Sequence, residues 1–130
     1  MEYDPRYLEG IRLYNCGRYW DSHEEWESMW HHASGAIRHF LQGLIQLDAA
    51  LIHTERAHWG GVANLLRRAL DHLQQCPPQM WGLDVARLRE QMQAYRSAIV
   101  ALRDHGRDTF DWDLKPELRI AGIPLEPDEP

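Results

Sequence analysis

The residues best suited to chemistry form two polar groups on neighbouring predicted helices. In the run HEEWE at 23–27, His23 and Glu27 lie one helical turn apart, and Glu24 lies beside them. On the next predicted helix, Gln46 and His53 lie two turns apart on one face. If the two helices pack antiparallel, these five side chains could converge into a single polar cluster.

Three interpretations of this cluster stay open. In the first, the side chains satisfy one another's hydrogen bonds and lock the helices together; we prefer it because ionisable clusters often serve structure alone. In the second, His23, Glu27 and His53 bind a divalent metal such as Zn, Fe, Ni or Mn, the only cofactor that the sequence suggests. In the third, His23 and Glu27 perform metal-free acid–base chemistry, although no nucleophile or oxyanion donor accompanies them.

The other histidines are weaker candidates for a site. His31 and His32 end their predicted helix, where positive charge complements the helix dipole. His58 falls in a loop before the next helix and could line the mouth of a pocket. We expect isolated surface positions for His39, His72 and His105.

Five predicted helices must position these residues. Caps, glycines and prolines place them at 5–16, 19–32, 36–56, from Trp59 to the prolines at 77–78, and from Asp84 to Gly106. The third is the least polar, so we expect it at the centre of the fold. The predicted fold class is all-α, a compact five-helix bundle over residues 1–106.

The residues after 106 change in character. Aromatic and acidic residues are followed by Pro116, Pro124, Pro127 and Pro130. We predict that residues 107–130 form an extended C-terminal tail whose aromatic part packs on the helical domain. The last residues, from Glu126 to Pro130, are predicted to be disordered.

The charge of the chain limits the classes of partner that it is expected to bind, and its cysteine content indicates the cellular compartment. Fourteen Lys and Arg against 20 Asp and Glu give a net charge of −6, which disfavours nucleic acid and anionic membranes. Only Cys16 and Cys76 are present, which favours free thiols in a reducing cytosol over a disulfide framework. Neither a signal peptide nor a membrane-spanning segment is predicted.

Four segments in order carry a resemblance to a known family: YNCGRYW at 14–20, HEEWESMW at 23–30, LQGLIQLDAALIH at 41–53 and GGVANLLRRALDHL at 60–73. Together they resemble the bacterial and archaeal family known as domain of unknown function 309. The resemblance implies a compact all-helical fold and an intracellular protein, and it implies no activity. The Gly-Asn that is typical of the family before the fourth helix is replaced here by Ala57-His58.

The sequence thus leaves two functions open. The preferred one is a cytoplasmic binding or interaction module in which the His/Glu cluster is structural. The fifth helix or a Trp-rich surface would then meet a partner, a second copy in a homo-oligomer being one candidate. The alternative is a metal-dependent enzyme, of hydrolytic type, that uses the cluster. Whether the chain is an enzyme stays open.

Overall fold

A computed structural model describes residues 2–106 and 109–126, and helices dominate it. The helices are α1 (Pro5–Asn15), α2 (Tyr19–Trp30), α3 (Gly35–Glu55), α4 (Trp59–Leu73) and α5 (Val85–His105), with a short 3₁₀ helix, η1 (Trp112–Leu114). This confirms the all-α prediction and places each predicted helix within a few residues of its expected bounds. In the described ranges, we find no helix with the length and apolar character needed to cross a bilayer.

Local signals fix the helix ends. The carboxylate of Asp4 accepts a hydrogen bond from the backbone N–H of Arg6 at 2.9 Å, and Pro5 supplies the first helical residue of α1. Asp84 caps α5 in the same way through the N–H of Arg87. Gly106 ends α5 with a left-handed φ of 68°, which glycine adopts without steric cost.

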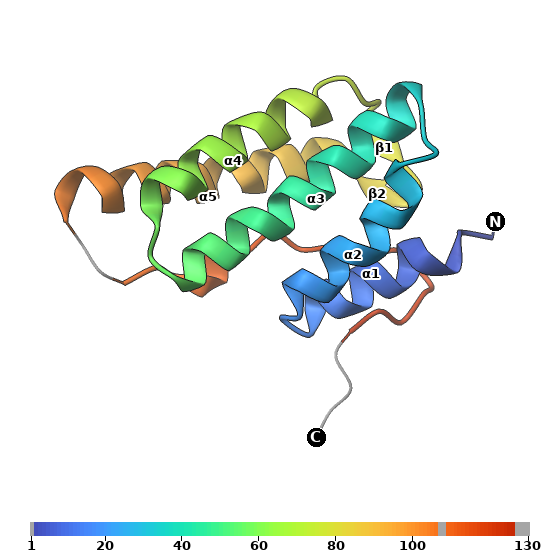
Figure 1. Ribbon diagram of the computed structural model, residues 1–130, viewed down its shortest axis with the longest axis horizontal. Coiled ribbons are helices and arrows are strands. Elements are labelled where there is room, and N and C mark those ends of the chain that lie inside the picture. Colours follow the sequence, from blue (N-terminus) through green and yellow to red (C-terminus); the bar gives the residue numbers. More distant parts are fainter. Residues whose placement is uncertain (1, 107–108, 127–130) are drawn as a thin grey trace.

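Helix α3 lies at the centre of the molecule (Figure 1). It packs against α2 on one side and α4 on the other, and α5 packs in turn against α4. Its apolar residues are buried around most of its circumference, among them Phe40, Leu41, Leu44, Leu47 and Leu51. Removing this apolar surface from water is the main stabilising contribution to the fold.

Helices α1 and α2 fit together around one glycine. The indole of Trp26 is fully buried and donates to the carbonyl of Tyr7 at 3.2 Å. A Cβ at Gly10 would lie only 2.1 Å from Trp26 Nε1, so this position has room for glycine alone. The hydroxyl of Ser22 donates to the carbonyl of Gly10 at 2.8 Å and fixes the register of the two helices.

A two-stranded hairpin that the sequence analysis did not predict joins α4 to α5. Strand β1 (Gln79–Met80) pairs antiparallel with β2 (Leu83–Asp84). The two turn residues, Trp81 and Gly82, have positive φ values of 47° and 78°, as a two-residue turn of type I′ requires. Because tryptophan seldom adopts such a φ, the sequence carried only a weak turn signal here.

The C-terminal segment returns from the end of α5 along α3 to α1 (Figure 1). Phe110, Leu118, Ile120 and Leu125 are buried in this segment. The side chain of Asn15, at the end of α1, donates to the carbonyls of Leu118 and Leu125 at 3.2 and 2.7 Å. Of the tail residues predicted to be disordered, 127–130 lie outside the described residues.

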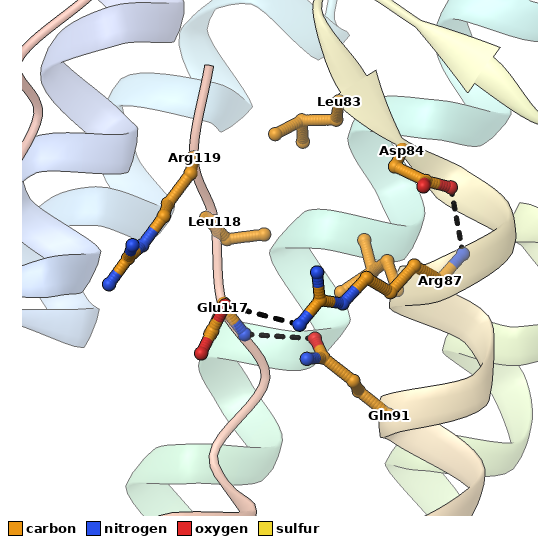
Figure 2. A pocket seen from close by; sticks show the side chains of 8 residues that line it. Leu83, Asp84, Arg87, Gln91, Glu117, Leu118 and Arg119 are labelled. Atoms are coloured by element: carbon orange, nitrogen blue, oxygen red, sulfur yellow. Dashed lines mark hydrogen bonds and ion pairs between the residues drawn. The ribbon is translucent and has the colours of Figure 1, made fainter. Parts of the chain in front are cut away.

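A small hollow marks the place where this segment crosses the start of α5 (Figure 2). The backbone N–H of Glu117 donates to Gln91 Oε1 at 3.1 Å, and the carboxylate of Glu117 pairs with Arg87 at 3.7 Å. The hollow encloses about 130 Å³. Its polar groups thus hold the C-terminal segment on α5.

Candidate functional site

A larger hollow, which contains predicted site residues, lies along the exposed side of α2. It has a volume of about 510 Å³ and is lined by Trp20, His23, Glu24, Glu27, Ser28 and His31. Steps of three and four residues place all six on one side of the helix. The opposite side of α2 is buried, through Tyr19, Ser22, Trp26 and Met29. The side of the helix that lines the hollow therefore faces solvent.

Trp20 is the most exposed large aromatic side chain in the described structure, at 62 % exposure. Its ring lies parallel to the imidazole of His23, with centroids 5.4 Å apart and an interplanar angle of 6°. Stacking on His23 holds one face of the indole. Tryptophan is one of the residue types enriched among the residues that contribute most to binding at protein interfaces.

The carboxylate of Glu27 lies between two imidazoles. Its Oε2 is 3.3 Å from His23 Nδ1, and its Oε1 is 3.7 Å from His31 Nε2. The side chain of Glu27 is 42 % exposed and that of His31 is 58 % exposed. Glu27 is therefore a surface carboxylate, which differs from the buried charge that the structural interpretation requires.

The hollow is acidic. Glu24 and Glu27 both line it, and none of its lining residues is a lysine or an arginine. An exposed aromatic ring beside two carboxylates is a combination that attracts organic cations, through the negative face of the ring and the charge of the acids.

The structure places the two predicted site residues of α3 elsewhere. Neither Gln46 nor His53 lines the hollow on α2. The ring of His53 lies 5.7 Å from that of His58, and a Cβ at Gly61 would lie 3.6 Å from His53 Nδ1. His53 Nδ1 and Gln46 Oε1 are both buried with no hydrogen-bond partner among the described residues. The five predicted residues thus do not share one pocket.

The predicted metal ligands are not assembled as a set of three. In residues 2–106 and 109–126, no group of three or more His, Cys, Asp or Glu side chains is arranged to hold a metal ion. His23 and Glu27 are in contact, whereas the ring contact of His53 is with His58.

A buried acid that the sequence analysis did not single out lies on α3. Asp48 is fully buried, and neither carboxylate oxygen has a hydrogen-bond partner among the described residues. Burial raises the pKa of Asp48 well above its usual range, and the nearby Ser22 and Lys115 only partly oppose this shift. Burial therefore favours the neutral form of the Asp48 carboxyl group. Its signal in the sequence is one acidic residue in the apolar run LIQLDAALI.

Lys115, the only lysine, approaches this acid from the C-terminal segment. Its ammonium group donates to the carbonyl of Tyr14 at 2.9 Å and lies over the rings of Tyr14 and Tyr19, 4.6 and 4.7 Å from their centroids. Burial lowers the pKa of Lys115, while Asp48 acts in the opposite direction. Burial also raises the pKa of Tyr19 to about 12, so its hydroxyl stays protonated.

Two histidines that were expected at isolated surface positions are in contact. His39 Nδ1 on α3 lies 2.9 Å from His72 Nδ1 on α4. Both side chains are partly buried. The expectation was wrong because the two residues lie 33 positions apart, and the spacing within one helix carries no information about contacts with another.

Comparison with known proteins identifies one family. Residues 7–65 match the model of the family described as Domain of unknown function (DUF309). This confirms the resemblance inferred from the four sequence segments. The match runs from α1 into α4 and includes the hollow on α2, Asp48 and His53. No curated protein matches the chain.

Proposed function

We propose that this chain, whose residues 7–65 match the model of the Domain of unknown function (DUF309) family, is a binding module that docks an arginine-bearing segment of a partner protein in the hollow on α2. The observation that carries the proposal is the exposed indole of Trp20 beside the carboxylates of Glu24 and Glu27. The proposal retains the interaction module favoured by the sequence and assigns its surface to α2.

Arginine fits this hollow better than lysine does. Its planar guanidinium stacks on aromatic rings and pairs with carboxylates through two parallel hydrogen bonds. The chain itself contains such a stack, since the guanidinium of Arg38 lies 3.8 Å from the ring centroid of Trp30. The net charge of −6 favours approach of a basic partner over a longer range.

The expected affinity of a single arginine is low. An exposed cation–π contact contributes about 0.5–1 kcal/mol, and an exposed ion pair contributes up to about 1 kcal/mol. A useful affinity therefore needs several basic residues in one segment. It should fall as salt is added, because exposed charges are screened within about 10 Å at 0.1 M ionic strength.

Titration calorimetry at low salt tests the proposal. It measures the affinity of the chain for a blocked hexapeptide that contains three arginines. We expect Trp20→Ala, Glu24→Gln and Glu27→Gln each to weaken binding roughly three- to tenfold, as the loss of about 1 kcal/mol implies. Trp112→Ala and Glu90→Gln are matched controls, because each removes an exposed residue of the same type outside the hollow.

Equal binding by the hollow variants and the controls would refute the proposed surface. Equal binding of a lysine peptide would refute the preference for guanidinium. Light scattering on the chain alone tests whether a second copy is the partner: a mass that rises with concentration, and that Trp20→Ala returns to the monomer, would replace the separate partner with self-association.

We also propose that the chain works in a reducing compartment such as the cytoplasm. The support is that Cys16 and Cys76 are both free, one exposed and one buried.

A further inference from the structure

We infer that His39 and His72 form a two-imidazole site for a divalent transition-metal ion at the junction of α3 and α4. This pair shares no residue with the hollow on α2 or with the three predicted metal ligands. The site differs from a closed structural metal centre because the protein supplies two ligands and water supplies the others.

The packing of the two helices sets the position of this pair. A Cβ at Gly43, one turn after His39, would lie 2.7 Å from the side chain of Leu73. The absence of a side chain at Gly43 therefore lets α3 and α4 approach closely. Since Leu73 directly follows His72, the same approach brings the two imidazoles together, with ring centroids 5.2 Å apart.

The separation of the two nitrogens suits a metal ion with ligands at right angles. Nitrogen ligands about 2.0–2.1 Å from an ion lie roughly 2.9 Å apart at a right angle and roughly 3.3 Å apart at a tetrahedral angle. The Nδ1 atoms of His39 and His72 are 2.9 Å apart. This distance is that of a hydrogen bond between the two rings, and it needs little change for both nitrogens to become neighbouring ligands of one ion such as Ni²⁺, with water completing the coordination.

The protonation of the pair is compatible with binding. Burial lowers the pKa of His72, as does the neighbouring His39, so His72 is neutral near pH 7. At present, one Nδ1 must carry the hydrogen that the other accepts. When a metal ion binds, that hydrogen moves to Nε2 of the same ring and both Nδ1 lone pairs turn toward the ion. No net charge is lost from the two rings in this step.

Titration of the untagged, chelator-treated protein with Ni²⁺ tests the site. We expect Ni²⁺ to raise the melting temperature of the wild type and of the control His32→Gln, which removes an exposed imidazole. His39→Gln and His72→Gln should each bind Ni²⁺ at least tenfold more weakly. Binding as tight as that of the wild type in either variant would refute the site.

A second measurement avoids any effect of the substitutions on folding. Ni²⁺ held by two imidazoles and several waters is six-coordinate and paramagnetic, so at substoichiometric amounts it should broaden the imidazole NMR signals of His39 and His72 in the wild type before those of His23 and His31. Broadening of His23 and His31 first would place the ion on α2 and overturn the inference.

Discussion

At the scale of single residues, Asp48 shows how a buried acid shapes the response to pH. Its neutral form is favoured in the folded state because burial raises its pKa above the value in the unfolded chain. The folded state therefore binds more protons than the unfolded state above about pH 4. It follows that the contribution of Asp48 to stability is highest at low pH and falls as the pH rises.

Asp48→Asn removes this titration while keeping the size of the side chain. Relative to the wild type, the variant should gain roughly 1 kcal/mol of unfolding free energy for each pH unit above about 4, until the raised pKa is reached. Urea denaturation of both proteins at pH 5, 6.5 and 8 measures this difference. If the wild type instead gains stability relative to the variant as the pH rises, Asp48 is ionised and paired with Lys115.

The sequence could locate some site residues and not others, for a physical reason. His23, Glu24 and Glu27 lie on one helix, where spacing alone places them together. Contacts such as His39 with His72 depend on how two helices are rotated against each other. That rotation is set by packing across the whole interface, including Gly43 against Leu73. For the same reason, spacing within one helix could not place Gln46 and His53 relative to His23, and neither residue lines the hollow on α2.

At the scale of helices and strands, glycine determines how closely α1 and α2 approach. Gly10→Ala would place a methyl group 2.1 Å from Trp26 Nε1. The indole must then move, which strains the core and disturbs the hydrogen bond from Trp26 to Tyr7. We expect a loss of about 2–4 kcal/mol in unfolding free energy, measured by urea denaturation.

Gly60→Ala is the matched control for this change. Gly60 lies exposed in the first turn of α4, and a Cβ there meets no atom within 4 Å. Because alanine reduces the freedom of the unfolded chain, a gain of about 0.4–1 kcal/mol is expected. Similar losses at both positions would show that contact with Trp26 is not the cause.

Helix bounds could be predicted better than the hairpin because their signals are local. Asp4-Pro5 and Asp84 cap helices through atoms two or three residues away. The turn at Trp81-Gly82 is held instead by distant contacts. The carbonyl of Trp81 accepts a hydrogen bond from the hydroxyl of Tyr7 at 2.8 Å, and the two rings lie 5.1 Å apart. No short window of sequence contains that partner.

At the scale of the whole molecule, Lys115 fastens the C-terminal segment to the helical core. In Lys115→Met the apolar stem is kept and the ammonium contacts with Tyr14 and Tyr19 are lost. We expect a loss of about 1–3 kcal/mol. Amide hydrogen exchange should become faster in residues 116–125, with little change in α3 and α4.

Arg119→Met provides the control for this experiment. Arg119 is an exposed cation of the same segment, paired with Glu126 at 3.3 Å, and such surface pairs contribute about 0–1 kcal/mol. In Arg119→Met, the amide exchange rates of residues 116–125 should stay close to those of the wild type. Equal acceleration in both variants would mean that general charge, and not the contact with Tyr14, holds the segment.

The bonds between α1 and the C-terminal segment also bear on how the chain matures during translation. The hydroxyl of Tyr14 donates to the carbonyl of Pro116 at 2.7 Å, and Asn15 reaches Leu125. These partners leave the ribosome about a hundred residues after α1 does, at roughly 5–20 residues per second. For several seconds, the nascent helices must therefore expose the surface that this segment later covers. A chaperone could bind that surface during this interval.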